Sequence, residues 1–280
     1  MQEVITSRQN PLIIWTASLS EKKYRDQFRL FLLEGKKLHE EAEANGIELS
    51  EIFVTEKYYQ EHRTALDRSY GEQAKLVNEQ KDKARLVICS EGAFSKISSE
   101  KSPEGIISTA KYLDKVHKFT TIYNAQEECG VGSRFILCDV RDPGNLGTAI
   151  RSAAAFGIDE LILSGCADLY HPKTVRGAMG ALFRQKITVV ADPVASVRAL
   201  IAAGKKVYAA ALTESAELLD RLPDTDVCFA VGNEGHGLSK EFISACTGAV
   251  LIPMLPGSES LNAAVAASIL MYCRGRKILK

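Results

Sequence analysis

The stretch from Ile252 to Ile269, IPMLPGSESLNAAVAASI, constrains the fold of this chain more than any other. An apolar segment ends at a proline, a loop rich in proline, glycine and serine follows, and Leu261 opens a run of small residues typical of a tightly packed helix. Proline and glycine end strands, and the hydroxyl of Ser258 or Ser260 can cap the first turn of the helix. A strand, a shaped loop and a buried helix start are a common basis for a ligand site in α/β proteins.

Two further stretches follow the same plan. They are residues 137–154, LCDVRDPGNLGTAIRSAA, and residues 227–239, VCFAVGNEGHGLS. In each, an apolar strand precedes a loop of glycine and asparagine and the start of a helix. We expect strands over residues 134–139, 160–164, 185–190, 206–211, 227–231 and 248–252, and helices that begin near Asn145, Lys173, Ala195, Ser215, Ser239 and Leu261. This alternation predicts a parallel sheet with helices on both faces.

The first 112 residues alternate on a smaller scale and predict a small α/β domain. Helical spacing covers residues 11–33 with a break near residues 18–21, and a later helix is expected to stop at Asn45-Gly46. Strands are expected over residues 49–55, 85–90 and 105–110, whereas residues 58–83 are polar with helical spacing. Residues 113–132 are less apolar, and we expect a linker there with room for one helix or short strand.

Charge and size narrow the class of protein. A chain of 280 residues makes one large domain or two ordinary ones. Its 35 basic and 35 acidic residues cancel, which argues against indiscriminate binding of polyanions. Residues 8–37 nevertheless hold seven basic and three acidic side chains, a local excess that suits contact with phosphates. A solvated helix face explains the same excess equally well.

Cysteine usage and hydropathy favour a cytoplasmic protein that does not enter membranes. The seven cysteines are dispersed without a Cys-x-x-Cys pair, as expected of reduced thiols. No apolar run is long enough to span a bilayer, and the N-terminus lacks the apolar core of a secretory signal. The five histidines form no cluster with metal-ligand spacing, so we expect no metal site.

The three strand–loop–helix stretches carry motifs that resemble, in order, those of the SpoU (TrmH) family of RNA 2′-O-ribose methyltransferases in the SPOUT superfamily. The matching residues are Asn145, Gly147 and Arg151 in the first stretch, Gly232, Asn233, Glu234, Gly237, Leu238 and Ser239 in the second, and Ile252, Pro253, Met254, Ser260, Leu261 and Asn262 in the third. One motif alone is weak evidence, whereas three in order at strand ends are specific. Asn262 is followed by two alanines where many relatives have valine and serine.

The resemblance implies an α/β architecture in two parts. Residues 133–280 would form the SPOUT methyltransferase domain, a parallel sheet with a deep trefoil knot. The protein would assemble as a homodimer. Residues 1–112 would form an L30e-like domain that binds the RNA substrate, since SRQNP, KKYRDQFRLFLLEG and SEKSPEGIISTA match the corresponding family domain. Residues 113–132 would link the two domains.

The resemblance also implies S-adenosyl-L-methionine as the cofactor. Its contacts, made largely by backbone groups, would fall on Leu212, Gly232, Ile252 and Leu261. Glycine at 232 would let the main chain approach a ligand closely. Without the resemblance, Ile252 and Leu261 read as ordinary core residues.

The catalytic positions implied by the resemblance are Asn145, Arg151, Glu234, Ser260 and Asn262. Asn145 and Arg151 would face the substrate nucleotide, although helix capping alone explains an asparagine at position 145. Ser260 and Asn262 would face the reacting ribose. For Glu234, support of the loop, orientation of the substrate and a dimer contact all stay open, and an acid at a helix start also complements the helix dipole.

Arg151 is expected to act as a phosphate clamp. Because a guanidinium stays protonated in proteins, it suits an anion better than it suits proton abstraction. The lost ribose proton would then pass to a phosphate oxygen or to water. His236, in the second loop, is expected to be a surface residue.

We therefore expect an S-adenosylmethionine-dependent RNA 2′-O-ribose methyltransferase, with large-subunit ribosomal RNA (rRNA) favoured as its substrate and transfer RNA (tRNA) as the alternative. Two other functions compete with this expectation. One is a non-catalytic RNA-binding protein that retains the fold, and the other is a nucleotide-binding oxidoreductase. The three intact motifs argue against the first, and the lack of a Gly-x-Gly-x-x-Gly fingerprint argues against the second.

Overall fold

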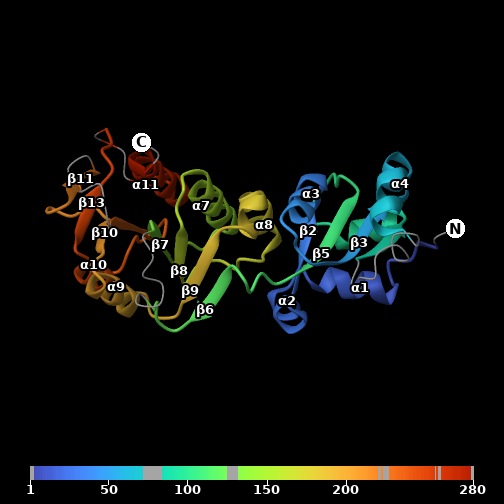
Figure 1. Cartoon of the computed structure of the whole chain (residues 1–280), viewed down its shortest axis with the longest axis horizontal. Coiled ribbons are helices and arrows are strands. Elements are labelled where there is room, and N and C mark those ends of the chain that lie inside the picture. The colour runs from blue at the N-terminus through green and yellow to red at the C-terminus, as the bar shows by residue number, and fades with distance from the viewer. Residues whose placement is uncertain are drawn as a thin grey trace. The chain divides into compact units, whose positions relative to one another are not determined.

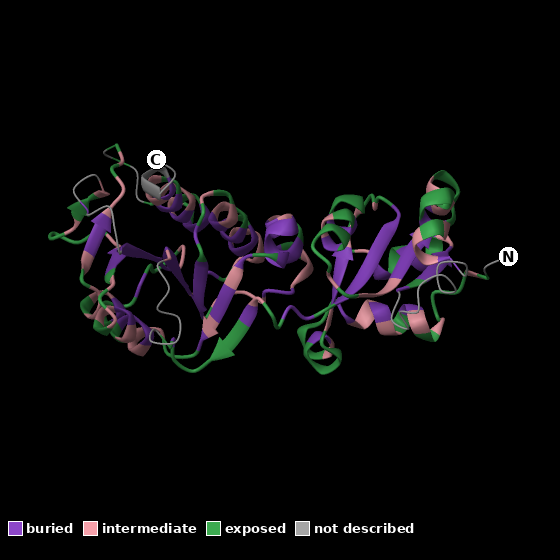
Figure 2. Ribbon diagram, in the orientation of Figure 1, coloured by how far each residue is buried: buried purple, intermediate pink, exposed green. Residues whose placement is uncertain are grey.

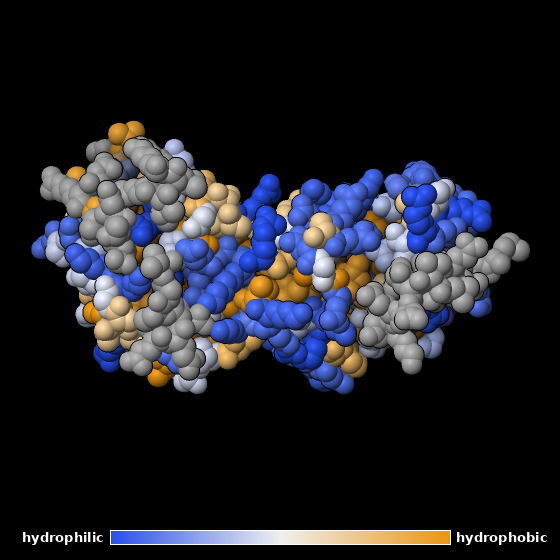
Figure 3. All heavy atoms as spheres, in the orientation of Figure 1, coloured by the Kyte–Doolittle hydropathy of each residue, from blue (hydrophilic) through white to orange (hydrophobic). Residues whose placement is uncertain are grey.

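The computed structural model describes residues 3–71, 84–124, 132–219, 222, 227–255, 257 and 260–278. The chain forms two compact units (Figure 1). Unit 1 comprises Met1–Leu113 together with Tyr170–Phe183, and unit 2 comprises Asp114–Leu169 together with Arg184–Lys280. Among the described residues in view, hydrophilic side chains cover more of the surface than hydrophobic ones (Figure 3).

Unit 1 is built on a mixed five-stranded sheet in the order β1-β4-β3-β5-β2. Its strands are β1 (Val4–Ile5), β2 (Leu30–Glu34), β3 (Leu49–Thr55), β4 (Arg85–Cys89) and β5 (Ile106–Lys111). The first, third and fourth strands are parallel, and β5 runs antiparallel to both β3 and β2. The three strands predicted from the sequence in this part of the chain are confirmed to within one residue.

Helices cover both faces of this sheet because side chains alternate along each strand. On one face, Phe53 packs in a cluster with Ile13 of α1 (Pro11–Ser18) and Phe94 of α6 (Glu91–Ile97). On the other, Ile52 packs with Leu66 of α4 (Glu56–Tyr70), and α3 (Lys36–Ala44) lies beside it (Figure 1). The strands are accordingly buried while the outer helix faces are exposed (Figure 2).

The helix boundaries in unit 1 follow the predicted stop signals. The expected break near residues 18–21 separates α1 from α2 (Lys22–Phe28), and α3 ends before Asn45 and Gly46, whose φ is +65°. The helical stretch expected over residues 58–83 corresponds to α4 as far as Tyr70, and residues 72–83 lie outside the described residues.

A short segment from later in the chain completes unit 1. It contains α8 (Pro172–Ala178) and the 3₁₀ turn η1 (Met179–Phe183). The ring of Tyr170 stacks on Tyr112 with centroids 3.9 Å apart and also contacts Phe31. Arg176 pairs with Glu100, so this basic side chain already has a carboxylate partner within unit 1.

Unit 2 contains an eight-stranded sheet in which every pair of neighbours is parallel, in the order β11-β13-β10-β12-β7-β8-β9-β6. The strands are β6 (His117–Thr120), β7 (Arg134–Cys138), β8 (Glu160–Ser164), β9 (Lys186–Val190), β10 (Lys206–Ala210), β11 (Glu217–Leu218), β12 (Val227–Val231) and β13 (Gly248–Leu251). The predicted parallel sheet is confirmed. The segment over residues 113–132 supplies β6, which extends the sheet by pairing with β9.

Helices again lie on both faces of this sheet. The helices are α7 (Pro143–Ala155), α9 (Pro193–Ala202), α10 (Lys240–Ala245) and α11 (Ala263–Ile278). One buried cluster joins Ile136 to Val197 of α9 and Phe242 of α10, whereas α7 and α11 pack against each other on the opposite side (Figure 1). The expected helix near Ser215 is wrong: the described residues there form a turn and the edge strand β11. None of the described helices is long and apolar enough to cross a membrane.

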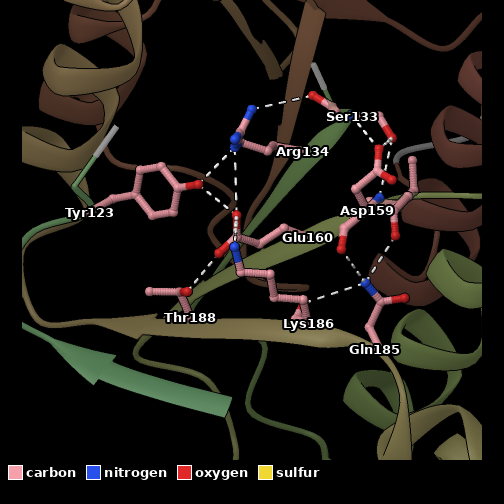
Figure 4. A network of polar contacts seen from close by, with 10 residues as sticks. Tyr123, Ser133, Arg134, Asp159, Glu160, Gln185, Lys186 and Thr188 are labelled. Carbon is pink, nitrogen blue, oxygen red and sulfur yellow. Dashed lines mark hydrogen bonds and ion pairs between the residues drawn. The ribbon is translucent and has the colours of Figure 1, made fainter. Parts of the chain in front are cut away.

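A line of charged side chains crosses the sheet at the beginnings of three neighbouring strands. Arg134, Glu160 and Lys186 are the first residues of β7, β8 and β9 and stand in register. The buried Glu160 carboxylate accepts hydrogen bonds from Tyr123 Oη (2.6 Å) and Thr188 Oγ1 (2.7 Å) (Figure 4). Arg134 Nε lies 3.5 Å and Lys186 Nζ 3.6 Å from Glu160 Oε2, and Arg134 Nε also donates to Tyr123 Oη.

Replacing Glu160 is expected to destabilise unit 2 strongly. Glu160→Ala leaves the buried Arg134 guanidinium without its carboxylate, a change that typically costs about 3–5 kcal/mol. Tyr123→Phe is the matched control, since it removes one hydroxyl and leaves the ion pair, and it should cost about 1–3 kcal/mol. Urea denaturation followed by circular dichroism compares the two. Equal losses for both variants would contradict a central role for the carboxylate.

A buried histidine in unit 1 makes its stability depend on pH. His39 Nδ1 lies 2.8 Å from Ser108 Oγ, and its Nε2 lies 3.6 Å from Glu43 and 3.5 Å from Tyr70 Oη. Burial lowers the pKa of His39 below 6.5, although Glu43 and Glu40 act in the opposite direction. The unfolded chain therefore binds a proton more readily than the folded one, and the neutral imidazole belongs to the folded state.

Unit 1 should lose stability as the pH falls below the ordinary histidine pKa. Above about 6.5 both states are neutral at this side chain, so the full stability is present there; below it, protonation favours the unfolded chain by up to about 1.4 kcal/mol per pH unit. Trp15, the only tryptophan of the chain, reports unfolding of unit 1 in urea at pH 7.5 and 5.5. His39→Gln should show a smaller difference between the two pH values. An unchanged difference would show that other groups cause it.

Candidate functional site

One cavity of about 500 Å³ lies at the carboxyl ends of β10, β12 and β13. The ends of parallel strands, where the chain turns into loops, are the usual position of ligand sites in such sheets. The lining residues come from the ends of these three strands, from the loops that follow them, and from α10 and α11, namely Ala210, Ala211, Leu212, Val231, Gly232, Asn233, Glu234, Gly235, His236, Gly237, Leu238, Ile243, Val250, Leu251, Ile252, Met254, Ser260, Leu261, Ala263 and Ala266. All four positions expected to contact the cofactor thus line one cavity, together with Glu234 and Ser260.

The loop after β12 is closed on itself. Asn233 and Gly237 form a two-bond bridge, with N···O distances of 3.2 and 3.0 Å. The Asn233 side chain accepts from the Gly235 amide (2.8 Å) and donates to the carbonyl oxygen of Asp139 (2.8 Å). A Cβ at Gly232 would lie 2.6 Å from the Gly237 carbonyl oxygen, closer than real Cβ atoms come to such a group. Glycine at 232 is therefore required by the loop itself, whatever binds beside it.

A chain of side-chain hydrogen bonds connects three of the expected catalytic residues. Asn145 Nδ2 donates to Glu234 Oε1 (2.6 Å), and Asn262 Nδ2 donates to Asn145 Oδ1 (3.0 Å). Asn145 comes from α7, Glu234 from the loop after β12, and Asn262 from the turn before α11. The structure thereby joins the three sequence motifs directly. Glu234 attaches the loop after β12 to α7, the helix of the first motif.

The structure excludes helix capping as the explanation of Asn145, and it excludes Ser260 as the cap of α11. Asp142 caps α7 by accepting from the Asn145 amide (2.9 Å), so Asn145 lies inside the helix and its side chain is available for the neighbouring loop. At α11 the cap is Asn262, whose Oδ1 accepts from the amides of Ala264 and Val265, rather than Ser260. Ser258, the other proposed cap, lies outside the described residues. Both polar atoms of Asn262 are consequently used to hold protein groups.

Arg151 lies on the exposed side of α7 and is not among the residues that line the cavity. It makes no hydrogen bond or ion pair with another residue that the structure describes. Its neighbour Ser152 bonds to Ser268 of α11 (2.7 Å), which fixes the side of α7 that faces the protein. Arg151 is therefore a cation held by a packed helix and open to an external anion.

Asp139 was missed by the sequence reasoning although it connects two of the motifs. It follows β7 with φ of +59°, a conformation that is uncommon for residues other than glycine. Its carboxylate accepts from Arg141 Nε (2.7 Å) and lies 3.1 Å from His236 Nε2, and Arg141 foremost lowers the pKa of this carboxyl. His236 is exposed, as predicted, but it is tied to the first motif through Asp139. An acid directly after a buried strand was the available signal.

The cavity suits S-adenosylmethionine in its volume and in its lining. Its volume lies in the range of cofactor sites, about 300–1,000 Å³. Apolar side chains such as Leu212, Ile252 and Leu261 can cover an adenine ring, and the loop from Gly232 to Leu238 brings backbone groups to the wall. Within the described part of the chain, no group of three or more His, Cys, Asp or Glu residues is placed to hold a metal ion.

Substitution within the loop after β12 should separate a required glycine from a tolerant one. Gly232→Ala places a methyl group against the Gly237 backbone and should open the loop, so that S-adenosylmethionine binding falls at least tenfold in calorimetry. Gly235→Ala is the control in the same loop, because its Cβ would meet only Asn233 Oδ1 at 3.4 Å. Its affinity should stay within about twofold. Equal affinities in both variants would place the cofactor elsewhere.

Comparison with known proteins identifies the family. The SpoU rRNA Methylase family model matches residues 132–272, and the MRM3-like substrate binding domain model matches residues 10–108. The 23S rRNA (guanosine(2553)-2′-O)-methyltransferase RlmP of Bacillus subtilis is 32% identical over 97% of this chain and 98% of its own length. A protein of Synechocystis described as an uncharacterized tRNA/rRNA methyltransferase, slr1673, is 29% identical over 96% of this chain and 92% of its own length.

Solved structures agree over almost the whole chain. The AdoMet-bound rRNA methyltransferase of Sinorhizobium meliloti superposes with a TM-score of 0.80 at 26% identity, covering 99% of both chains. A structure described as an RNA 2′-O ribose methyltransferase superposes with a TM-score of 0.76 at 27% identity, covering 99% of this chain and 100% of the other. Two of its motifs line one cavity, the first motif is hydrogen-bonded to both, and its relatives match over nearly their full length, so the chain belongs to the SpoU rRNA methylase family of S-adenosylmethionine-dependent RNA methyltransferases.

Proposed function

We propose that this chain methylates the 2′-hydroxyl of a ribose in large-subunit rRNA, with S-adenosylmethionine as the methyl donor. The observation that carries the proposal is that the second and third motif loops line one cavity, while Asn145 of the first motif is hydrogen-bonded to both of them. The relatives support the choice of RNA, since RlmP is named as a 23S rRNA 2′-O-methyltransferase and is similar over its full length.

The cofactor supplies a methyl group on a sulfonium, and the protein has to hold the ribose hydroxyl in line with it. Leu212, Gly232, Ile252 and Leu261 would hold the adenosine part in the cavity. Ser260 also lines the cavity and offers a hydroxyl to the reacting ribose. Asn145, Glu234 and Asn262 are engaged with one another, so their role is to keep the loops in the arrangement that the reaction needs.

Arg151 would bind a phosphate of the target nucleotide. It is exposed, it is positively charged, and it stands on the helix that begins with the first motif. A guanidinium fork gives two-point contact with a phosphate and stabilises negative charge that develops on the attacking oxygen. The hydroxyl proton then passes to a phosphate oxygen or to water.

A second copy of the chain would cover the outer surface of α7 and α11. Thr148, Phe156, Ala264, Val265, Ser268, Ile269 and Tyr272 line an apolar depression there. Val265 and Tyr272 are each almost half exposed, and side chains of this kind usually mark an interface. A homodimer through this surface would set Arg151, on the same helix, near the partner chain.

The C-terminal part of unit 2 would contain the trefoil knot. β13 pairs with β10 and β11, yet α11, which follows it, packs against α7 and β12 on the other side of β10. Between the end of β13 at Leu251 and the start of α11 at Ala263 the chain therefore returns past β10, and this return supports a knot. Residues 1–112 would recognise the RNA, with residues 113–132 as the connection to the methyltransferase part, and the whole enzyme would work in the cytoplasm.

The substrate is tested by mapping 2′-O-methyl groups in cells with and without the protein. Loss of one site in large-subunit rRNA is the expected result. Loss of a site in tRNA would replace the proposed substrate, and an unchanged pattern in both RNAs would overturn the enzymatic assignment.

Substitution of Arg151 tests the proposed clamp. Arg151→Ala should lower single-turnover methyl transfer by about a hundredfold or more, the size of effect seen when one transition-state donor is lost. Arg151→Lys keeps the charge without the fork and should also be slow. Cofactor affinity should not change. Arg198→Ala, which removes an exposed arginine of α9, is the control. Wild-type rates in Arg151→Lys would exclude a two-point contact.

A further inference from the structure

Aromatic side chains lie at the surface where α1 and α2 of unit 1 meet. The rings of Trp15 and Phe28 are arranged edge to face with centroids 5.7 Å apart, and Tyr24 stacks on Phe28 at 6.4 Å with planes only 12° apart. Phe28 is 36% exposed, and Ile14, the residue before Trp15 in the chain, is 46% exposed. We call Trp15, Tyr24 and Phe28 the aromatic corner. It is a group of aromatic side chains at the surface, outside the buried core of unit 1.

The packing of α1 and α2 fixes the position of the aromatic corner. The neighbours of these side chains on α1, Ile13 and Thr16, are fully buried on the side of the helix that faces the sheet and α6. The buried guanidinium of Arg25 donates to the carbonyl oxygens of Leu19 (2.8 Å) and Ser20 (2.7 Å), so it fixes the angle between the two helices. The rings are therefore positioned before any ligand arrives, which lowers the entropic cost of binding to them.

Basic side chains border the aromatic corner. Lys22 and Lys23 begin α2 and are exposed, and Lys23 Nζ lies 5.5 Å from the centre of the Tyr24 ring. Arg29 follows the helix and stands over the ring of Tyr112 at 4.7 Å. The two carboxylates of this region are Asp26, which pairs with Lys22, and Glu21, which directly precedes α2. Lys22, Lys23 and Arg29 outnumber them, so the border carries an excess of one positive charge next to exposed ring faces.

We propose that the aromatic corner stacks an unpaired base of the RNA substrate while Lys22 and Lys23 contact the adjoining phosphates. This inference rests on the proposed role of residues 1–112 in recognising RNA and names the residues that do so. Exposed rings flanked by cations are how proteins bind single-stranded nucleic acid, since every base offers a π-face and every nucleotide a charge. All of these residues lie within the match to a substrate-binding domain over residues 10–108.

An RNA occupant accounts for the charge, which a protein partner would not require. A second copy of this chain would bring the same lysines to the same surface, and like charges there would repel. A duplex hides the faces of its bases, so the corner suits a loop, bulge or single strand.

The sole tryptophan makes the inference directly measurable in the intact protein, because Trp15 belongs to the corner. A single-stranded adenosine decamer should quench its fluorescence on binding, since the base stacks against the ring cluster. An abasic ribose–phosphate strand of equal length, which keeps the phosphates, should leave the emission almost unchanged. Equal quenching by both strands, or none by either, would overturn the stacking of a base.

Substitutions then show which groups provide the affinity. Phe28→Ala should weaken binding of the decamer by about fivefold to a hundredfold, with an unchanged salt dependence, and Phe28→Tyr should restore it. Phe119→Ala, which removes a 58% exposed phenylalanine of β6, is the control and should bind normally. Circular dichroism checks that each variant is folded. Normal binding by Phe28→Ala would contradict the inference.

Two further outcomes separate this inference from the role of unit 1 as a whole. The double variant Lys22→Ala/Lys23→Ala should bind less tightly and with a shallower dependence on salt, because fewer counterions are released. If this variant is impaired while Phe28→Ala is not, unit 1 binds RNA but the corner does not stack a base. If neither is impaired, unit 1 does not use this surface for RNA. A concentration-dependent shift of Trp15 emission without RNA would assign the corner to a second copy.

Discussion

The carboxylate of Glu160 sets the register of the central strands of unit 2. A buried charge is tolerated only when its partners are in place, and here they come from the first residues of the two neighbouring strands and from the segment before β7. A shift of either neighbour by one residue would turn Arg134 or Lys186 to the opposite face of the sheet. One acidic side chain thereby fixes how β7, β8 and β9 align. The same alignment determines where the loops at the carboxyl ends of these strands begin.

The loops of the candidate site depend on that alignment. Asp139 follows β7 in a left-handed conformation. Its carbonyl oxygen accepts a hydrogen bond from Asn233, and its carboxylate contacts His236. Asn145 then connects the same region to Glu234 and Asn262. Stability and function depend on opposite ends of the strands. The charges at the beginnings of the strands hold the register, and hydrogen-bonded side chains at the carboxyl ends shape the cavity.

The polar residues of the motifs therefore serve the site in two ways. Arg151 and Ser260 present groups to the outside or to the cavity, whereas Asn145, Glu234 and Asn262 use their side chains on one another. A residue whose donors and acceptors are already satisfied positions its neighbours more readily than it binds a substrate. Unit 1 shows the same division, since the buried Arg25 holds two helices at the angle that leaves Phe28 exposed.

The sequence alone determined the parallel sheet and most of its strands, because apolar periodicity and glycine-rich turns are local signals. The family was indicated separately, by the resemblance of the three motifs. It also led to the four positions that line the cavity, through motifs at strand ends. The tertiary structure decided the rest. Asn145 looked like a capping or catalytic residue, and Ser258 or Ser260 like the cap of the last helix, until Asp142 was seen to cap α7 and Asn262 to cap α11. Likewise, Ser215 precedes an edge strand rather than a helix because pairing with β13 outweighs local helical spacing. The hydrogen-bond partners of the Asn145 side chain and the strand that pairs with β11 come from distant parts of the chain, so neither the role of this asparagine nor the edge strand can be assigned from the few residues around it.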